Sequence, residues 1–150
     1  MRLTLHSTKV LNLALSQDGL PQEAEDGGFW VPDLASNDHE ESKYELTFSI
    51  AYMEGADDRY AVIFNFSSHL PSQALRLDVT YIAEFKVSEP VSPEFKDSHF
   101  ARVNSPAIAF PYLRAFVSNF LLSSGYEPMI LPSINFQALD AERRQKANGE

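Results

Sequence analysis

The sequence contains no cysteine, so neither disulfide bonds nor thiolate chemistry is available to its 150 residues. This absence favours a reducing compartment. The sequence also lacks a hydrophobic run near the ~18 residues that cross a bilayer. Near the N-terminus the polar run Ser7-Thr8-Lys9 ends the apolar pattern early, which does not indicate a secretory signal. We therefore predict a cytoplasmic protein that does not insert into membranes.

Basic residues are scarce, with 12 Lys and Arg against 21 Asp and Glu and a net charge of −9. Nucleic-acid binding depends on cationic neutralisation of phosphates, so this composition argues against a nucleic-acid partner. The acidic charge has two interpretations, which stay open. It either keeps the protein soluble or attracts basic segments of a partner.

Signals for catalysis and cofactors are also missing. The histidines lie far apart, at His6, His39, His69 and His99, without the spacing of a zinc site. No glycine-rich loop joins a strand to a helix, and no nucleophile motif surrounds the serines. We predict no enzymatic activity, no metal and no cofactor, while a carboxylate pair assembled only in space stays open.

Alternating apolar residues predict most of a sheet. They mark a first strand from Leu3 to Leu15 with a polar break or bulge, and further strands over 44–52, 60–66 and 75–87. A long loop, Gln17 to Ser42, follows the first strand, while short turns make the later neighbours antiparallel. The last strand alternates apolar residues with Arg76, Asp78 and Glu84, so we expect one dry face and one wet face.

Helices are predicted in the C-terminal third, after a second connection over Ser88–Asn104. Ser105 before Pro106 is a typical helix start, Pro111 predicts a bend or a fresh start, and Gly125 ends the helix. Asn135 caps a last helix that runs to about residue 146. We predict an α+β fold: a four-stranded antiparallel sheet with a long crossover loop, followed by two C-terminal helices. A single domain spans 1–150, with a polar C-terminal helix and tail at 138–150.

The stretch Pro106–Leu122 is apolar almost all the way round when placed on a helix. A surface helix of a monomer keeps a broad polar face. This helix must therefore be covered on more than one side, and association with further copies of the chain is the simplest cover.

The aromatic residues of the long loop, Phe29 and Trp30, also stand out in polar sequence. Either they pin the loop down by burying Trp30, or the loop and the final helix wall a hydrophobic groove. Aromatic side chains in such a wall would suit extended, unfolded segments of many proteins.

Three short motifs carry a family resemblance: Phe110-Pro111-Tyr112-x-Arg114, Gly125-x-x-Pro128, and Leu131-Pro132-x-Ile134-Asn135-Phe136-x-Ala138-Leu139. In this order and spacing they resemble the C-terminal half of the SecB family of bacterial export chaperones. The resemblance implies an ATP-independent holdase that binds unfolded precursor proteins and keeps them competent for export. It also implies a homotetramer built as a dimer of dimers.

The resemblance assigns residues to two surfaces. Client binding is implied for Trp30, Phe29, Tyr44, Leu46, Leu131, Ile134, Phe136 and Leu139. Contacts between subunits are implied for Tyr112, Phe116, Val117, Phe120, Leu121 and Asp78.

One departure concerns the SecA motor. Family members that deliver clients to SecA carry acidic residues on the first strand, after the position of Lys9. Val10 and Ala14 stand at the corresponding places here, which puts SecA docking in doubt. A chaperone dedicated to one partner, such as an antitoxin, is therefore the alternative function.

Overall fold

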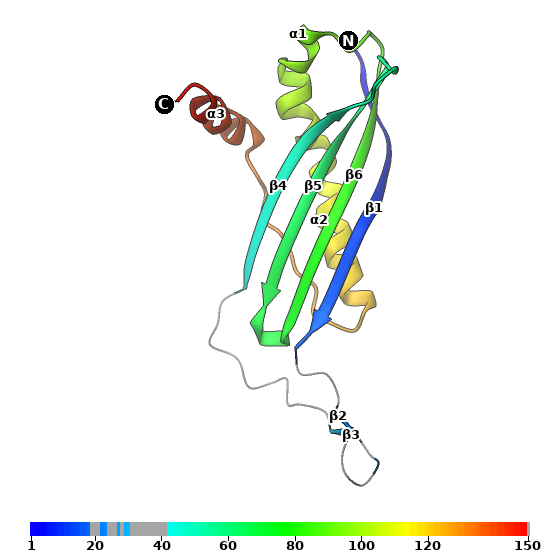
Figure 1. The fold of residues 1–150 in the computed structure, drawn as a ribbon, viewed down its shortest axis with the longest axis vertical. Helices are drawn as coiled ribbons and strands as arrows, with labels where there is room; N and C mark the ends of the chain where they lie inside the picture. Colours follow the sequence, from blue (N-terminus) through cyan, green and yellow to red (C-terminus); the bar gives the residue numbers. More distant parts are fainter. Residues whose placement is uncertain (19–21, 24–26, 28, 31–41, 150) are drawn as a thin grey trace. The chain divides into compact units, whose positions relative to one another are not determined.

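The computed structural model describes residues 1–18, 22–23, 27, 29–30 and 42–149. In chain order its elements are β1 (Leu3–Gln17), β2 (Gln22–Glu23), β3 (Phe29–Trp30), β4 (Lys43–Tyr52), β5 (Arg59–Leu70), the 3₁₀ turn η1 (Pro71–Gln73), β6 (Leu75–Val87), α1 (Pro93–Lys96), the π-helical segment η2 (Phe100–Asn104), α2 (Ser105–Ser123) and α3 (Phe136–Ala147) (Figure 1).

The long strands form a four-stranded antiparallel sheet in the order β1-β6-β5-β4, so the first strand lies beside the last (Figure 1). The predicted α+β fold is confirmed. β1 runs through its polar stretch without a break, but its alternation of exposed and half-buried residues shifts by one position at Ser7–Thr8. Within the predicted long loop, β2 and β3 make a short antiparallel pair in which Gln22 faces Trp30.

The chain divides into two compact units. Unit 1 comprises Met1–Lys9, Phe48–Ile63 and Tyr81–Glu150, and unit 2 comprises Val10–Thr47 and Phe64–Thr80. Every second residue of β5 and β6 is buried in each unit, as the period of two predicts. In unit 2 these include Phe64, Phe66, Leu75, Leu77 and Val79. The single-domain organisation over 1–150 stays a prediction.

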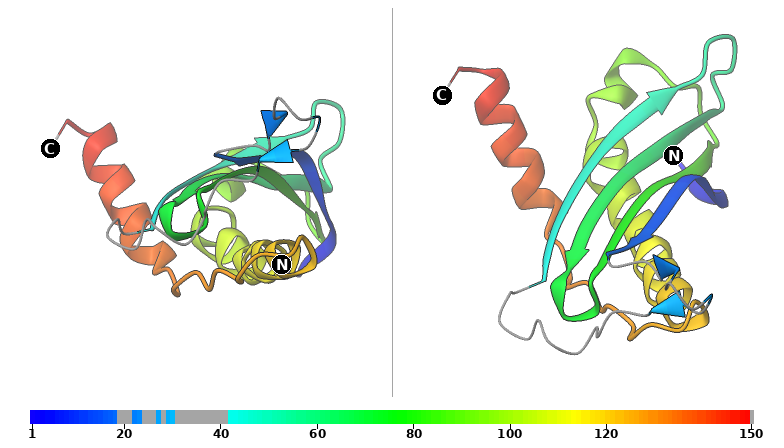
Figure 2. Two further views of the ribbon diagram at one scale, coloured as in Figure 1. Left: turned by 90° about the horizontal axis from the view of Figure 1, so that it is seen from below. Right: turned by 60° about the horizontal axis from the view of Figure 1, so that its bottom comes forward.

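In unit 1, α2 covers one face of the sheet, seen from below in Figure 2. The Phe116 ring stacks on Tyr81 of β6 with 5.7 Å between ring centres. The helix ends as Gly125 predicts. Gly125 has a φ of 94°, its N–H bonds to the Leu122 carbonyl, and the Tyr126 N–H bonds to the Leu121 carbonyl. This is a Schellman motif, which satisfies the last carbonyls of the helix.

The start of α2 differs from the prediction. The connection before it is partly helical: Ser92 caps α1 by accepting from the Phe95 N–H, and η2 leads into α2 without a gap. The prediction that Ser105 caps this helix is therefore wrong. Its N–H bonds to the Phe100 carbonyl five residues back, which is the π-helical pattern. α2 also continues through Pro111 without a fresh start.

Ser105 instead completes a buried hydrogen-bond chain. Its hydroxyl donates to the Phe100 carbonyl at 2.6 Å and accepts from the hydroxyl of Tyr60. Tyr60 is fully buried and packs between the rings of Phe85 and Phe95.

Replacing Ser105 with alanine is expected to lower stability more than replacing Tyr60 with phenylalanine. The Ser105→Ala change leaves a buried tyrosine hydroxyl without its partner, which costs about 1–3 kcal/mol. Tyr60→Phe removes that hydroxyl and keeps the Ser105 bond, so about 0.5–1.5 kcal/mol is expected. Urea unfolding of both variants measures the difference, and a larger loss for Tyr60→Phe would contradict this hydrogen-bond direction.

Stability is also expected to fall at alkaline pH because of Tyr60. Burial raises the pKa of Tyr60 from 10.0 to about 12. Below the unfolded pKa of about 10, both states hold this proton, and the contribution of Tyr60 to the free energy of unfolding is complete. Above pH ~10 the unfolded chain loses the proton while the native protein keeps it, so this contribution begins to fall. It is lost as pH rises through the folded pKa. Unfolding free energies measured across this range should fall more steeply for the native sequence than for Tyr60→Phe, and equal slopes would contradict the assignment.

Candidate functional site

The final helix α3 is held beside β4 in unit 1 by a small number of contacts (Figures 1 and 2). Asn135 caps it as predicted, because its side chain accepts from the Ala138 N–H at 3.0 Å. Phe136 packs edge-on against Phe48 and Phe110, with ring centres 5.5 and 5.7 Å away. The Arg143 guanidinium lies 4.2 Å from the centre of the Phe48 ring and donates to the Phe48 carbonyl.

The predicted client residues of unit 1 fall into two groups. Leu131 is 1% exposed and Phe136 is buried in the aromatic cluster, so both support the chain's own core. Ile134 and Leu139 are half-buried and keep part of their surface in solvent. The sequence reading missed Ile130, which is 75% exposed, the largest fraction among the exposed large apolar residues of the described chain.

The remaining predicted client residues belong to unit 2. Tyr44 is exposed, with its ring tilted against Phe66 at 6.1 Å between centres, and Leu46 is half-buried. Phe29 and Trp30 form β3, but their side chains lie outside the described part of the structure. Their predicted roles stay predictions.

The subunit-contact residues predicted on α2 lie on different sides of this helix. Val117 and Leu121 are fully buried within the chain. Phe116 and Phe120 are half-buried and stack on each other at 5.7 Å between ring centres. Tyr112, on the outer face, is 50% exposed.

Two residues that the sequence reading did not select share this outer face, Ile108 and Leu122. At 3.6 residues per turn, positions 108, 112, 115, 119 and 122 follow one side of a helix. The chain thus covers one side of α2 and leaves an apolar side uncovered, which we call the outer face of α2.

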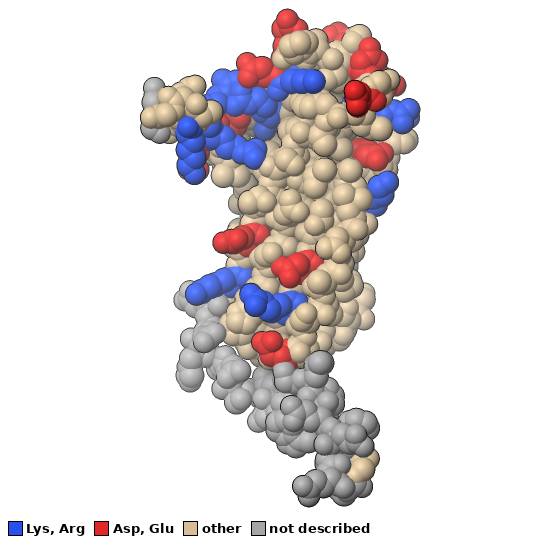
Figure 3. All heavy atoms as spheres, viewed as in Figure 1, with Lys and Arg blue, Asp and Glu red and all other residues tan. Residues whose placement is uncertain are grey.

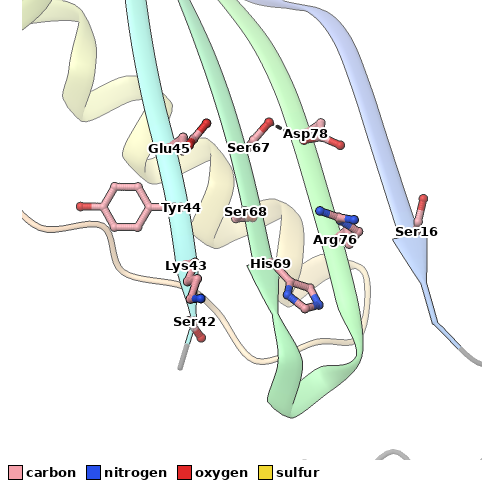
Figure 4. A pocket seen from close by; sticks show the side chains of 10 residues that line it. All are labelled: Ser16, Ser42, Lys43, Tyr44, Glu45, Ser67, Ser68, His69, Arg76 and Asp78. Atoms are coloured by element: carbon pink, nitrogen blue, oxygen red, sulfur yellow. Dashed lines mark hydrogen bonds between the residues drawn. The ribbon is translucent and has the colours of Figure 1, made fainter. Parts of the chain in front are cut away.

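Asp78 lies in unit 2, in an open depression of about 1010 Å³ on the sheet (Figure 4). It accepts a 2.6 Å hydrogen bond from Ser67 on the neighbouring strand. Arg76 and His69 line the same depression, so its charges are mixed. Its role in subunit contact stays a prediction.

Of the first-strand positions considered for SecA, only the basic one is charged in this chain. Lys9, at the basic position, lies 3.7 Å from Glu84 on β6. Val10 is half-buried and Ala14 is exposed. Neither position 10 nor position 14 therefore presents the carboxylate that the resemblance associates with SecA docking.

Two tyrosines have shifted acidities. Burial raises the pKa of Tyr52 and, more strongly, that of Tyr60. The Lys96 ammonium lies 4.6 Å from the centre of the Tyr52 ring. Among the described residues, no group of three or more metal-ligating side chains is arranged to hold an ion. Tyr60 lies in the buried aromatic core of unit 1, and the half-buried Tyr52 packs against it with ring centres 5.9 Å apart.

The fold and the exposed apolar side chains define an α+β protein with surfaces suited to other polypeptides. Residues 31–147 match the family model described as preprotein translocase subunit SecB. The chain belongs to the SecB family. In the part of the chain that the structure describes, every helix is too short or too polar to cross a membrane.

Individual relatives agree with this assignment. The protein-export protein SecB of Magnetococcus marinus is 29% identical over 110 residues, covering 71% of this chain and 69% of that protein. The SecB of Xanthomonas campestris strain 8004 is 48% identical over 46 residues, which is 30% of this chain and 27% of that protein. The strongest identity is thus confined to a short segment.

A solved structure shares the fold. It is the SecB-like chaperone of Mycobacterium tuberculosis in complex with a peptide from an antitoxin, with a TM-score of 0.60. The match covers 89% of this chain and 88% of that one at 13% sequence identity. At this identity the likeness shows the fold alone.

Proposed function

We propose that this protein is an ATP-independent holdase that binds unfolded precursor proteins and keeps them competent for export. Membership of the SecB family supports this function. The observation that carries it is that apolar side chains outside the outer face of α2 keep surface in solvent, namely Tyr44, Ile130, Ile134 and Leu139.

We further propose which residues contact clients. In unit 1 the contacts come from Ile130, Ile134 and Leu139, which keep surface in solvent, while Leu131 and Phe136 hold the segment in place. In unit 2 they come from Tyr44 and Leu46, together with the predicted Phe29 and Trp30. Several weak apolar anchors along one extended client add up without demanding a sequence.

The assembly we propose is a homotetramer built as a dimer of dimers. Contact between subunits would then cover the apolar outer face of α2. Tyr112 is the central contact, flanked by the half-buried Phe116 and Phe120. Val117 and Leu121 support this face from inside the chain.

Replacing Leu139 with alanine, alone or with Trp30→Ala, is expected to weaken client holding. Losing one partly buried anchor corresponds to about 1 kcal/mol, so about five times more chaperone should be needed for half-suppression of aggregation. The assay is light scattering of a chemically denatured client diluted into the chaperone. Gln137→Ala, exposed on the same helix, is the matched control and should leave suppression unchanged.

One result would contradict the function, and another would reassign Leu139. Failure of the native sequence to suppress aggregation at one tetramer per client would remove the holdase proposal itself. Loss of the tetramer in Leu139→Ala would instead assign this residue to assembly, and solution mass separates the two cases.

The second candidate is a chaperone dedicated to one partner, such as an antitoxin, that does not deliver clients to SecA. The uncharged Val10 and Ala14 support it. Competition between several unrelated unfolded proteins separates the candidates, because a dedicated chaperone would keep one partner and ignore the rest. A SecA pull-down that recovers the chaperone would contradict this alternative.

A further inference from the structure

Four charged side chains of unit 1 form a closed ring that joins α3 to the segment before α2. Arg102 of η2 bonds to Asp97 at 2.9 Å and to Asp140 of α3 at 2.7 Å. Arg144 of α3 closes the ring, at 3.3 Å from Asp97 and 3.8 Å from Asp140. Each member therefore contacts two groups of opposite charge. Figure 3 shows Lys and Arg side chains gathered over and beside α3.

The ring is placed where it can be strong and still respond to salt. The Arg102 and Asp140 side chains are only 20% and 16% exposed, so solvent screens their contact weakly. Asp97 and Arg144 are well exposed, so added salt reaches the other half of the ring. Isolated surface ion pairs contribute little, but a network of four charges with short contacts contributes more.

α3 has few other contacts. Phe136 is its buried residue, Leu139 is half-buried, and residues 141–149 are exposed. Beyond the ring ion pairs, Arg143 contacts the Phe48 ring and carbonyl, and Arg144 donates to the Asp97 carbonyl at 3.4 Å. A twelve-residue helix is marginal in water when it lacks tertiary contacts. The ring must therefore supply a large share of what keeps α3 in place.

We propose that the Asp97–Arg102–Asp140–Arg144 ring is an ionic latch that holds α3 closed and opens it locally as ionic strength rises. Opening α3 uncovers the faces of Phe48, Phe110 and Phe136 that contact one another when it is closed. The latch stands on the geometry alone. Its use, enlarging the apolar surface offered to a client, rests on the proposed holdase function.

Hydrogen exchange of the full-length protein, followed by mass spectrometry without any client, tests the latch. Asp140→Asn should speed exchange of the α3 amides about tenfold, equivalent to about 1.4 kcal/mol of local opening. Glu142→Gln removes the same charge from an exposed position of the same helix and should leave exchange unchanged. Peptides from β6 and α2 should keep their protection in both variants.

Salt provides a test that needs no substitution. Raising sodium chloride from about 0.1 M to about 1 M shortens the screening length from about 10 Å to about 3 Å, so α3 of the native sequence should exchange faster. Asp140→Asn should show a smaller response, because only the exposed Arg144–Asp97 contact still joins α3 to the segment before α2. The effects of Arg102→Gln and Asp140→Asn should add to less than their sum when the two changes are combined, because both remove the Arg102–Asp140 contact.

Equal exchange in Asp140→Asn and Glu142→Gln, or no salt response in the native protein, overturns the latch. Faster exchange spread equally over α2 and β6 also overturns it, because the ring would then stabilise the whole unit. Aggregation assays report separately on the function. A working latch with unchanged client holding in Asp140→Asn would leave the holdase intact and remove only the proposed use of the latch.

Discussion

Leu131→Ala is expected to destabilise the protein by about 2–5 kcal/mol, whereas Ile130→Ala should change stability by less than about 0.5 kcal/mol. The two residues are adjacent aliphatic side chains of similar size, but Leu131 is 1% exposed and Ile130 is 75% exposed. Truncating Leu131 removes buried apolar surface and leaves a cavity. Truncating Ile130 removes surface that water already covers.

The same two variants test whether Ile130 contacts clients while Leu131 supports the core. Denaturant unfolding measures the stability difference, and aggregation suppression of the same samples measures client holding. We expect Ile130→Ala to weaken holding at unchanged stability, and Leu131→Ala to act through stability. Equal destabilisation by both variants would show that Ile130 is buried in solution by a contact within or between chains.

Tyr112→Glu is expected to disrupt the proposed tetramer. If the outer face of α2 is covered by another copy, the new carboxylate loses water without gaining a partner. Such an unpaired buried charge costs about 3 kcal/mol or more, which weakens association at least about a hundredfold. Light scattering coupled to size exclusion should show a mass below that of the native assembly at micromolar concentration.

The control adds the same charge elsewhere. Gln137→Glu lies at an exposed position of α3 and should leave the mass unchanged. Circular dichroism of Tyr112→Glu should retain the native helix content, because Tyr112 is half exposed within the chain. An unchanged tetramer in Tyr112→Glu would mean that this face stays in water and that subunits meet elsewhere.

Local signals in the sequence were sufficient for most of the fold. Alternation located β4, β5 and β6, and chemistry at single positions ended α2 at Gly125 and capped α3 at Asn135. These features depend on residues a few positions apart, which a sequence displays directly. The family motifs lie in the same C-terminal region and are short and ordered, so the family could be predicted too.

Other features required the folded chain. Pro106–Leu122 is apolar all round, so its pattern could not separate the buried Val117 and Leu121 from the outer Tyr112. The prolines and charges of 88–104 resemble a loop, yet Phe95 of α1 packs on Tyr60 of β5 and Arg102 of η2 bonds to Asp140 of α3. The ionic ring joins residues more than forty positions apart, from Asp97 to Asp140, which no local pattern reveals.

The π-helical turn η2 sets the direction in which Arg102 leaves the helix. Such a turn holds one more residue than an α-helical turn, so deleting one residue between 100 and 104 could leave a smooth, regular helix. The regular helix would rotate the side chain at position 102 by roughly 100° about the helix axis, out of reach of Asp140. A regular α-helix over residues 100–104 and an Arg102 side chain directed at Asp140 are therefore incompatible.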